Sequence, residues 1–224
     1  MDRIPDHIDL DPQETQDVFY HLTVGNEKTA HPAMPAGAGE GIVRGMYLLR
    51  EANVVGHKPR VQLLGSGAIL KEVIAAADLL QHDFDVIADI WSVTSYTELR
   101  REWLEIERWN RLHPTEAQRT SFVQRQLTNT AGPVIAATDC MKAVPDQISG
   151  FMPAKRRFVT LGTEGFGRSD TREALRKHFE VDRHHVAVAA LKALADDGLL
   201  PAQEVARAIA KYGIDTEARS AALG

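Results

Sequence analysis

A glycine-rich turn is the most suggestive local motif for ligand chemistry. Gly65, Ser66 and Gly67 lie between an apolar run typical of a strand and a segment with helical periodicity. Backbone N–H groups at such a turn, together with the helix dipole, can hold a phosphate. The full dinucleotide fingerprint needs a third glycine where this chain has Leu70, and a later acidic residue, but Asp89 lies within a predicted strand. We therefore favour a tight turn that holds no ligand.

Cysteine and histidine offer weaker candidates for catalysis or metal binding. Cys140, the single cysteine, follows Asp139 at a predicted helix start, where a helix dipole favours the thiolate. No base partner can be traced in the sequence, so we expect Cys140 to be a small buried residue. None of the nine histidines has the i, i+4 spacing with a carboxylate that zinc hydrolases use. The sequence therefore assigns no catalytic, cofactor-binding or metal-binding residue.

Topology predicts one further candidate site. In open parallel α/β sheets, ligands and partners meet the carboxyl ends of the strands. The residues that follow the predicted strands should therefore share one edge, and those expected to bind an anion or a partner are Ser66, Thr94, Ser95, Asp139, Arg168 and Asp170. Small hydroxyl side chains and one fork-shaped guanidinium suit an anion or a partner backbone. The alternative is a solvated rim of loops.

These candidates depend on an alternation of strand and helix signals along the chain. Apolar runs of strand length alternate with segments of helical period, which predicts an α/β fold. We expect strands at residues 60–64, 85–93, 133–138 and 157–161, and helices at residues 40–51, 69–80, 97–110, 141–150, 170–178, 187–195 and 201–211. Asp170 with Glu173 has capping-box spacing, whereas Asp182 and Gly213 should cap the last two helices.

Residues 1–36 are predicted to form an arm outside this domain. The nine residues 31–39 contain two prolines and two glycines, which is typical of an irregular linker. A short apolar run at residues 18–24 indicates an orphan strand. We therefore expect a boundary near residue 37 and an α/β domain over residues 37–224.

The composition narrows the classes of partner. With 44% hydrophobic and 25% charged residues, the 224-residue chain can bury one good core. A net charge of −5, with Lys and Arg scattered among acidic residues, argues against nucleic acid as a partner. No stretch approaches the roughly 20 apolar residues that span a bilayer, and the amino terminus lacks the apolar core of a signal peptide. We expect a cytoplasmic protein without a membrane partner.

Several sequence blocks together resemble a known family. The most specific are ERWNRLHP and GTEGFGRSDTRE, accompanied by VQLLGSGAILKEV, SVTSYTELRRE and PVIAATDCMK. In this order they resemble the last quarter of the homodimeric pyruvate dehydrogenase decarboxylating component, a thiamine-diphosphate-dependent 2-oxo acid dehydrogenase similar to transketolase. The resemblance covers the chain from about Asp17 to Asp215.

The resemblance implies a fold and a role. The implied fold is a doubly wound, mostly parallel five-stranded sheet with one antiparallel edge strand, like the carboxy-terminal domain of transketolase. Two preceding domains of the family bind thiamine diphosphate and Mg²⁺, and their cofactor motifs are absent from this sequence. This chain alone is therefore expected to bind no cofactor and to be inactive.

The implied function is structural. In the complete enzyme, such a domain supports a dimer that decarboxylates pyruvate oxidatively and transfers the acetyl group to lipoamide. The implied partners are the remaining domains or subunits, a second copy in a homodimer, and the lipoyl acyltransferase component of the complex. Two other classes stay open, namely an anion- or partner-binding module that uses the strand ends, and a small independent enzyme that uses Cys140 or a histidine.

Overall fold

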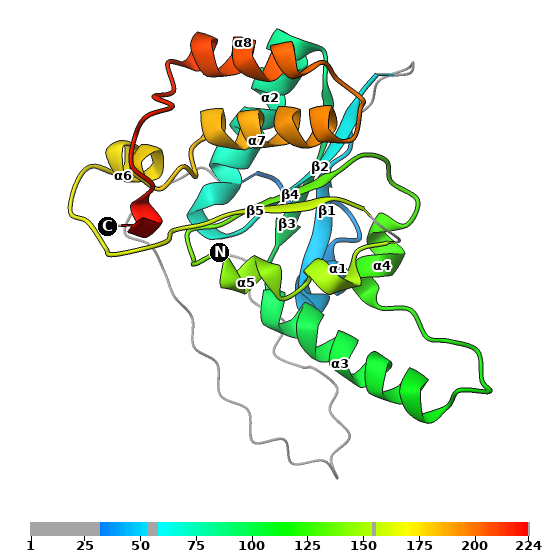
Figure 1. The fold of residues 1–224 in the computed structure, drawn as a ribbon. Coiled ribbons are helices and arrows are strands. Elements are labelled where there is room, and N and C mark those ends of the chain that lie inside the picture. Colours follow the sequence, from blue (N-terminus) through cyan, green and yellow to red (C-terminus); the bar gives the residue numbers. More distant parts are fainter. Residues whose placement is uncertain (1–31, 53–57, 154–155, 224) are drawn as a thin grey trace. The chain divides into compact units, whose positions relative to one another are not determined.

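The computed structural model describes residues 32–52, 58–153 and 156–223, and its compact unit begins at Ala33 (Figure 1). The orphan strand predicted at residues 18–24 lies outside the described residues. It stays a prediction, as does the boundary near residue 37.

A five-stranded sheet forms the centre of this unit, with the strand order β1-β3-β2-β4-β5. The strands are β1 (Met46–Arg50), β2 (Arg60–Gly65), β3 (Ile87–Val93), β4 (Val134–Ala137) and β5 (Phe158–Leu161). Only β1 runs antiparallel to its neighbour, whereas β3, β2, β4 and β5 pair in parallel. The predicted α/β fold with a mostly parallel sheet and one antiparallel edge strand is confirmed.

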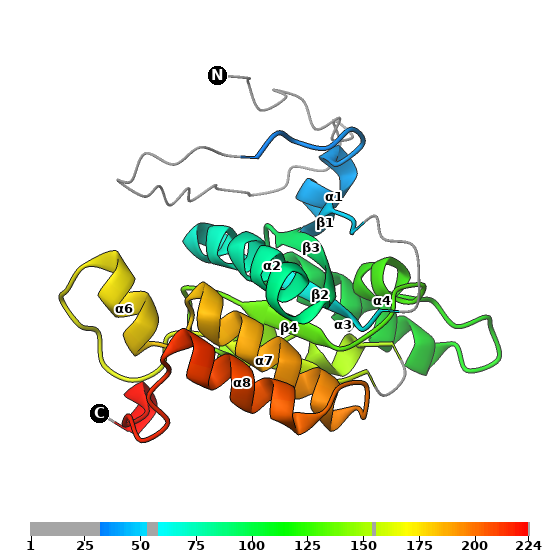
Figure 2. The same cartoon turned by 90° about the horizontal axis from the view of Figure 1, so that it is seen from above.

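Helices cover both faces of the sheet, as a doubly wound fold requires. On one face lie α2 (Leu70–Phe84), α7 (Arg183–Asp196) and α8 (Ala202–Tyr212); on the other lie α3 (Tyr96–Leu112), α4 (Phe122–Leu127) and α5 (Ala143–Asp146) (Figure 1). Figure 2 shows α7 and α8 side by side over the strands. The short helices α1 (Gly39–Arg44) and α6 (Arg172–His178) and three 3₁₀ turns at Gly67–Ile69, Ser149–Phe151 and Ala221–Leu223 complete the fold.

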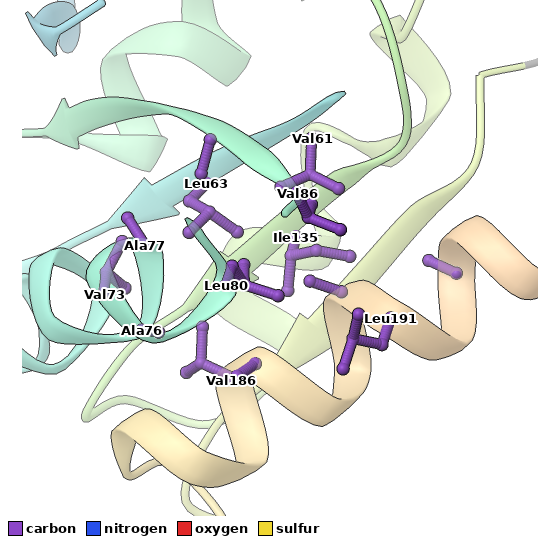
Figure 3. Packing of buried hydrophobic residues seen from close by; sticks show 14 of the residues in the cluster. Val61, Leu63, Val73, Ala76, Ala77, Leu80, Val86, Ile135, Val186 and Leu191 are labelled. Carbon is purple, nitrogen blue, oxygen red and sulfur yellow. The ribbon is translucent and has the colours of Figure 1, made fainter. Parts of the chain in front are cut away.

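The larger core lies between the sheet and the α2, α7 and α8 layer. Val61, Leu63 and Ile135 from the strands meet Leu80 of α2 and Leu191 of α7 there, as Figure 3 shows. Residues alternate between the faces along each strand, so Leu64 of β2 joins the second core, under α3 and α4. The continuous apolar strands predicted from the sequence are therefore strands buried on both sides.

The helix predicted at residues 40–51 is wrong, because the chain changes from helix to strand within that range. Gly45 has φ 106° and ends α1, and β1 follows from Met46. A side chain at Gly45 would lie 2.5 Å from the carbonyl oxygen of Ser95, so only glycine fits. Pairing with β3 then buries Met46 completely, and tertiary contact overrides local helical periodicity.

Two further differences concern helix starts. No helix is predicted between residues 110 and 133, yet Ser121 and Gln124 form a capping box at the start of α4. Thr171, rather than Asp170, caps α6, since its hydroxyl accepts the N–H of Ala174. Asp182 and Gly213 cap α7 and α8 as predicted.

A buried carboxylate ties the helical layer together. Glu72 of α2 has a side chain only 5% exposed. It accepts hydrogen bonds from Nε of Arg183 at 2.9 Å, from the Arg183 backbone N–H at 3.2 Å, and from Arg176 at 3.3 Å. These contacts join α2 to α6 and to the start of α7, which are more than a hundred residues away in sequence. The turn between α6 and α7 is thus anchored to α2.

We predict that Glu72→Gln lowers the free energy of unfolding by about 2–3 kcal/mol, because a neutral amide replaces the buried carboxylate to which both Arg183 and Arg176 donate. Urea unfolding followed by circular dichroism would measure the change. Asp78→Asn is the matched control, since Asp78 also lies on α2 and pairs with an arginine, but both side chains of that pair are exposed. The control should lower the free energy of unfolding by less than about 1 kcal/mol. Equal losses in both variants would contradict the stabilising role proposed for Glu72.

Candidate functional site

The carboxyl ends of β2 and β4 meet at the centre of the sheet. The connection after β2 leads to β3 on one side, whereas β4 lies on the other, so the strand order reverses between them. Ser66 follows β2 and its hydroxyl donates a 2.8 Å hydrogen bond to Oγ1 of Thr138, which follows β4. The same Thr138 oxygen accepts the N–H of Cys140 at 3.1 Å. Hydroxyl groups therefore converge at the crevice where α/β folds bind ligands.

Asp139 lies beside the turn that follows Ser66. Gly67 has φ 55°, and a side chain there would lie 2.9 Å from a carboxylate oxygen of Asp139. The turn between β2 and α2 therefore has to be glycine to let this carboxylate approach. Cys140 is exposed, so the expectation that it is buried is wrong. It lies in the loop beyond the buried end of β4, where hydrogen bonds hold both its backbone N–H and its carbonyl.

Tyr96 adds a group that sequence reasoning missed. Its side chain is 5% exposed, and its hydroxyl is the only buried side-chain nitrogen or oxygen without a hydrogen-bond partner in the described part of the chain. Burial raises the pKa of Tyr96 well above its usual value; the nearby Ser66 partly offsets this shift, and Cys140 adds to it. The burial of the Tyr96 hydroxyl could not be predicted from the sequence, because nothing near Tyr96 in the chain distinguishes it from an exposed residue in the first turn of a helix.

Thr94 and Ser95, also predicted for the site, make hydrogen bonds within the domain. Thr94 donates its hydroxyl to the carbonyl of Ile42 at 2.7 Å, and Ser95 accepts the N–H of Glu98 as the cap of α3. Both backbone N–H groups donate to the carbonyl of Gly45. These bonds fix the end of β3 to the α1–β1 turn and engage both side chains.

The glycine-rich loop after β5 is fastened to the loop after β4. Thr163 donates its N–H to the carbonyl of Cys140 and its hydroxyl to the carbonyl of Asp139, both at 2.9 Å. A carboxylate oxygen of Glu164 accepts the N–H of Lys142 at 2.6 Å. Arg168 and Asp170 lie further along this loop and are exposed. The two loops thus form one rigid rim, whose outer part presents the guanidinium to solvent.

The sequence that forms this sheet and rim matches a known protein family. A model of the transketolase-like TK C-terminal domain matches residues 45–182, which is more than half of the chain. The chain belongs to this family. Its matched region begins just before β1 and ends at the cap of α7, so it contains the whole sheet and the rim. The fold predicted from the sequence blocks is thereby confirmed.

Curated relatives of this transketolase-like C-terminal domain are named pyruvate dehydrogenase E1 component. The relatives from Cupriavidus necator and Pseudomonas aeruginosa are each 56% identical to it, over 90% and 93% of this chain. The relative from Escherichia coli is 48% identical over 92% of this chain. The chain spans only 22–23% of the length of these relatives. The predicted resemblance to the pyruvate dehydrogenase decarboxylating component is confirmed.

The described residues of this transketolase-like domain do not fit a metal-diphosphate cofactor. No three His, Cys, Asp or Glu side chains within residues 32–52, 58–153 and 156–223 are grouped so that they could hold a metal ion. At the rim, the free carboxylate of Asp139 beside the turn at Gly67 would repel a diphosphate. No helix in the described ranges is long and apolar enough to cross a membrane.

We predict that Tyr96→Phe leaves the free energy of unfolding unchanged or raises it by up to about 1 kcal/mol, since it removes a buried hydroxyl that makes at most a weak contact with Ser66, whose own hydroxyl donates to Thr138. The comparison variant is Thr138→Val, whose hydroxyl is equally buried but bonded, and which should cost about 1–2 kcal/mol. Chemical denaturation of both variants would measure the difference. A loss in Tyr96→Phe as large as that in Thr138→Val would show that the tyrosine hydroxyl has a partner in solution.

Proposed function

We propose that this domain is the carboxy-terminal structural and dimerisation domain of a pyruvate dehydrogenase decarboxylating component. That enzyme decarboxylates pyruvate oxidatively and transfers the acetyl group to lipoamide. The observation that carries the proposal is 56% identity to pyruvate dehydrogenase E1 components over 90% of this chain. The family match over residues 45–182 supports the same role.

In this proposal, thiamine diphosphate and Mg²⁺ bind to other parts of the enzyme. The chain spans only 22–23% of the length of the pyruvate dehydrogenase E1 relatives, which leaves most of such an enzyme available to bind the cofactor. The domain then contributes no group to the chemical steps, and it acts by holding the remaining domains in position. Alone it would be inactive.

The proposed partners are the remaining domains or subunits of the dehydrogenase, a second copy in a homodimer, and the lipoyl acyltransferase component in the cytoplasm. The rim at the strand ends is our candidate surface for the first of these. Phe166 in the glycine-rich loop is 80% exposed, and Met141 in the loop after β4 is 56% exposed. Two large apolar side chains on the rim, with Arg168 in the same loop as Phe166, suit a protein surface better than a free anion.

We predict that this chain shows no Mg²⁺-dependent binding of thiamine diphosphate in isothermal titration calorimetry, because its described residues offer no metal site. The titration is run with Mg²⁺ and again with a chelator, and a complete pyruvate dehydrogenase E1 component from Pseudomonas aeruginosa is the positive control. Micromolar binding that requires Mg²⁺ and no other protein would overturn the proposed division of labour.

A chimera tests the structural role. In it, this chain replaces the matching portion of the Pseudomonas aeruginosa relative. We predict that the chimera decarboxylates pyruvate and that Phe166→Ala weakens association of its subunits or domains about ten-fold, equal to about 1.4 kcal/mol. The measurements are analytical ultracentrifugation and the decarboxylation rate.

The control for that chimera is Leu199→Ala, which removes a side chain 53% exposed between α7 and α8, away from the rim loops. Neither substitution should change the stability of the isolated chain by more than about 0.5 kcal/mol, since both side chains are exposed. If Phe166→Ala and Leu199→Ala behave alike in the chimera, the rim is not the contact surface.

A further inference from the structure

A hollow of about 570 Å³ lies at the edge of the sheet where the parallel strands begin, at the opposite end of the strands from the rim. It is lined by Arg119, Thr120, Gln124, Thr128, Pro153 and Arg156. Arg156 lies two residues before β5, and Thr128 lies between α4 and β4, so the hollow is next to the amino ends of these parallel strands. Its volume is in the range of sites for small molecules.

Arg156 is held in place by neutral groups only. Its Nη1 donates to the carbonyl of Leu127 at 2.9 Å and to the hydroxyl of Thr130 at 2.7 Å, and its Nη2 donates to the carbonyl of Thr130. Burial lowers the pKa of Arg156, with no carboxylate to counter the effect. A guanidinium has further N–H groups beyond these three bonds, and they remain for a ligand.

Arg119 is exposed and also has no acidic partner among the described residues, but its guanidinium stacks on an aromatic ring. Its guanidinium lies 3.8 Å from the centre of the Trp109 ring. Its backbone N–H donates to Asn110 at 2.8 Å, and its carbonyl accepts from the same side chain at 3.0 Å. The loop that carries Arg119 is therefore fastened to the end of α3, and the guanidinium lies against Trp109 of that helix.

The absence of acid partners distinguishes these two arginines from most others. Ion pairs with Asp or Glu occupy Arg44, Arg50, Arg60, Arg101, Arg125, Arg157, Arg176, Arg183 and Arg207. The carboxylate of Glu102, on the helix that leads to Arg119, is taken by Arg44 and Arg125. No acidic residue lines the hollow among the residues described. It therefore concentrates positive charge in a protein of net charge −5.

We propose that this hollow binds a small phosphate-bearing molecule, with Arg119 and Arg156 as the charged donors. Guanidinium forks match the oxygens of a phosphate in geometry as well as charge. The hydroxyl of Thr120 and the amide nitrogen of Gln124 add neutral donors, since the amide oxygen of Gln124 already accepts from Ser121. This site is independent of the proposed role in pyruvate dehydrogenase and of the rim.

Inorganic diphosphate is the probe for the test. It is titrated into the chain at low ionic strength, with a chelator to remove divalent cations, and binding is followed by calorimetry and by tryptophan fluorescence, to which Trp109 contributes. We expect saturable binding that weakens at least about ten-fold in Arg119→Gln, the loss expected for one charge-assisted contact. Arg156→Lys, which keeps the charge and loses the fork, should weaken it as well.

The matched control is Arg100→Gln, which removes the same charge from an exposed position on α3 outside the hollow. It should leave binding of diphosphate within about two-fold. The proposal is overturned if diphosphate fails to bind at millimolar concentration, if Arg100→Gln and Arg119→Gln weaken it equally, or if citrate, a carboxylate anion of similar charge, binds more tightly. Thermal unfolding of each variant verifies that Arg119→Gln and Arg156→Lys are folded.

Discussion

Burial of the central strands on both faces is the constraint on which this fold depends. Every residue of β3 and of β4 is buried, and β2 is buried from Val61 onward. A strand of this kind is stable only if helices cover both of its sides. The layer of α2, α7 and α8 therefore needs the layer of α3, α4 and α5, although the two layers share no core residue.

Polar groups inside such a sheet have to bond to one another, and those of β2 and β3 do. Asp89 is 3% exposed and accepts from Arg60 at 2.7 and 2.8 Å and from Gln62 at 2.7 Å. The ring N–H of Trp91 donates to the amide oxygen of Gln62 at 2.8 Å. This closed network accounts for an acidic residue in mid-strand without invoking a ligand, in agreement with the weak nucleotide-binding signal of the sequence.

The same geometry separates two surfaces with different chemistry. Because the strands are parallel, the chain enters β5 beside Arg156 and leaves it at Thr163 in the rim. One end presents arginines without acids, and the other presents hydroxyls, a carboxylate and exposed apolar side chains. The proposed contact surface for the larger enzyme and the proposed anion site therefore lie at opposite ends of the parallel strands.

Much of the fold and the family could be predicted from the sequence alone. Apolar runs predicted four strands, Asp182 and Gly213 predicted the start of α7 and the end of α8, and the sequence blocks such as GTEGFGRSDTRE predicted the family, because each depends on local backbone preference or on a contiguous motif. Only the tertiary structure decided that residues 46–50 form an edge strand, that Cys140 is exposed, that the hydroxyl of Tyr96 is unpartnered, and that Arg119 and Arg156 share a hollow. These four features arise from groups far apart in the chain, whose burial and pairing exist only once the two helical layers enclose the sheet.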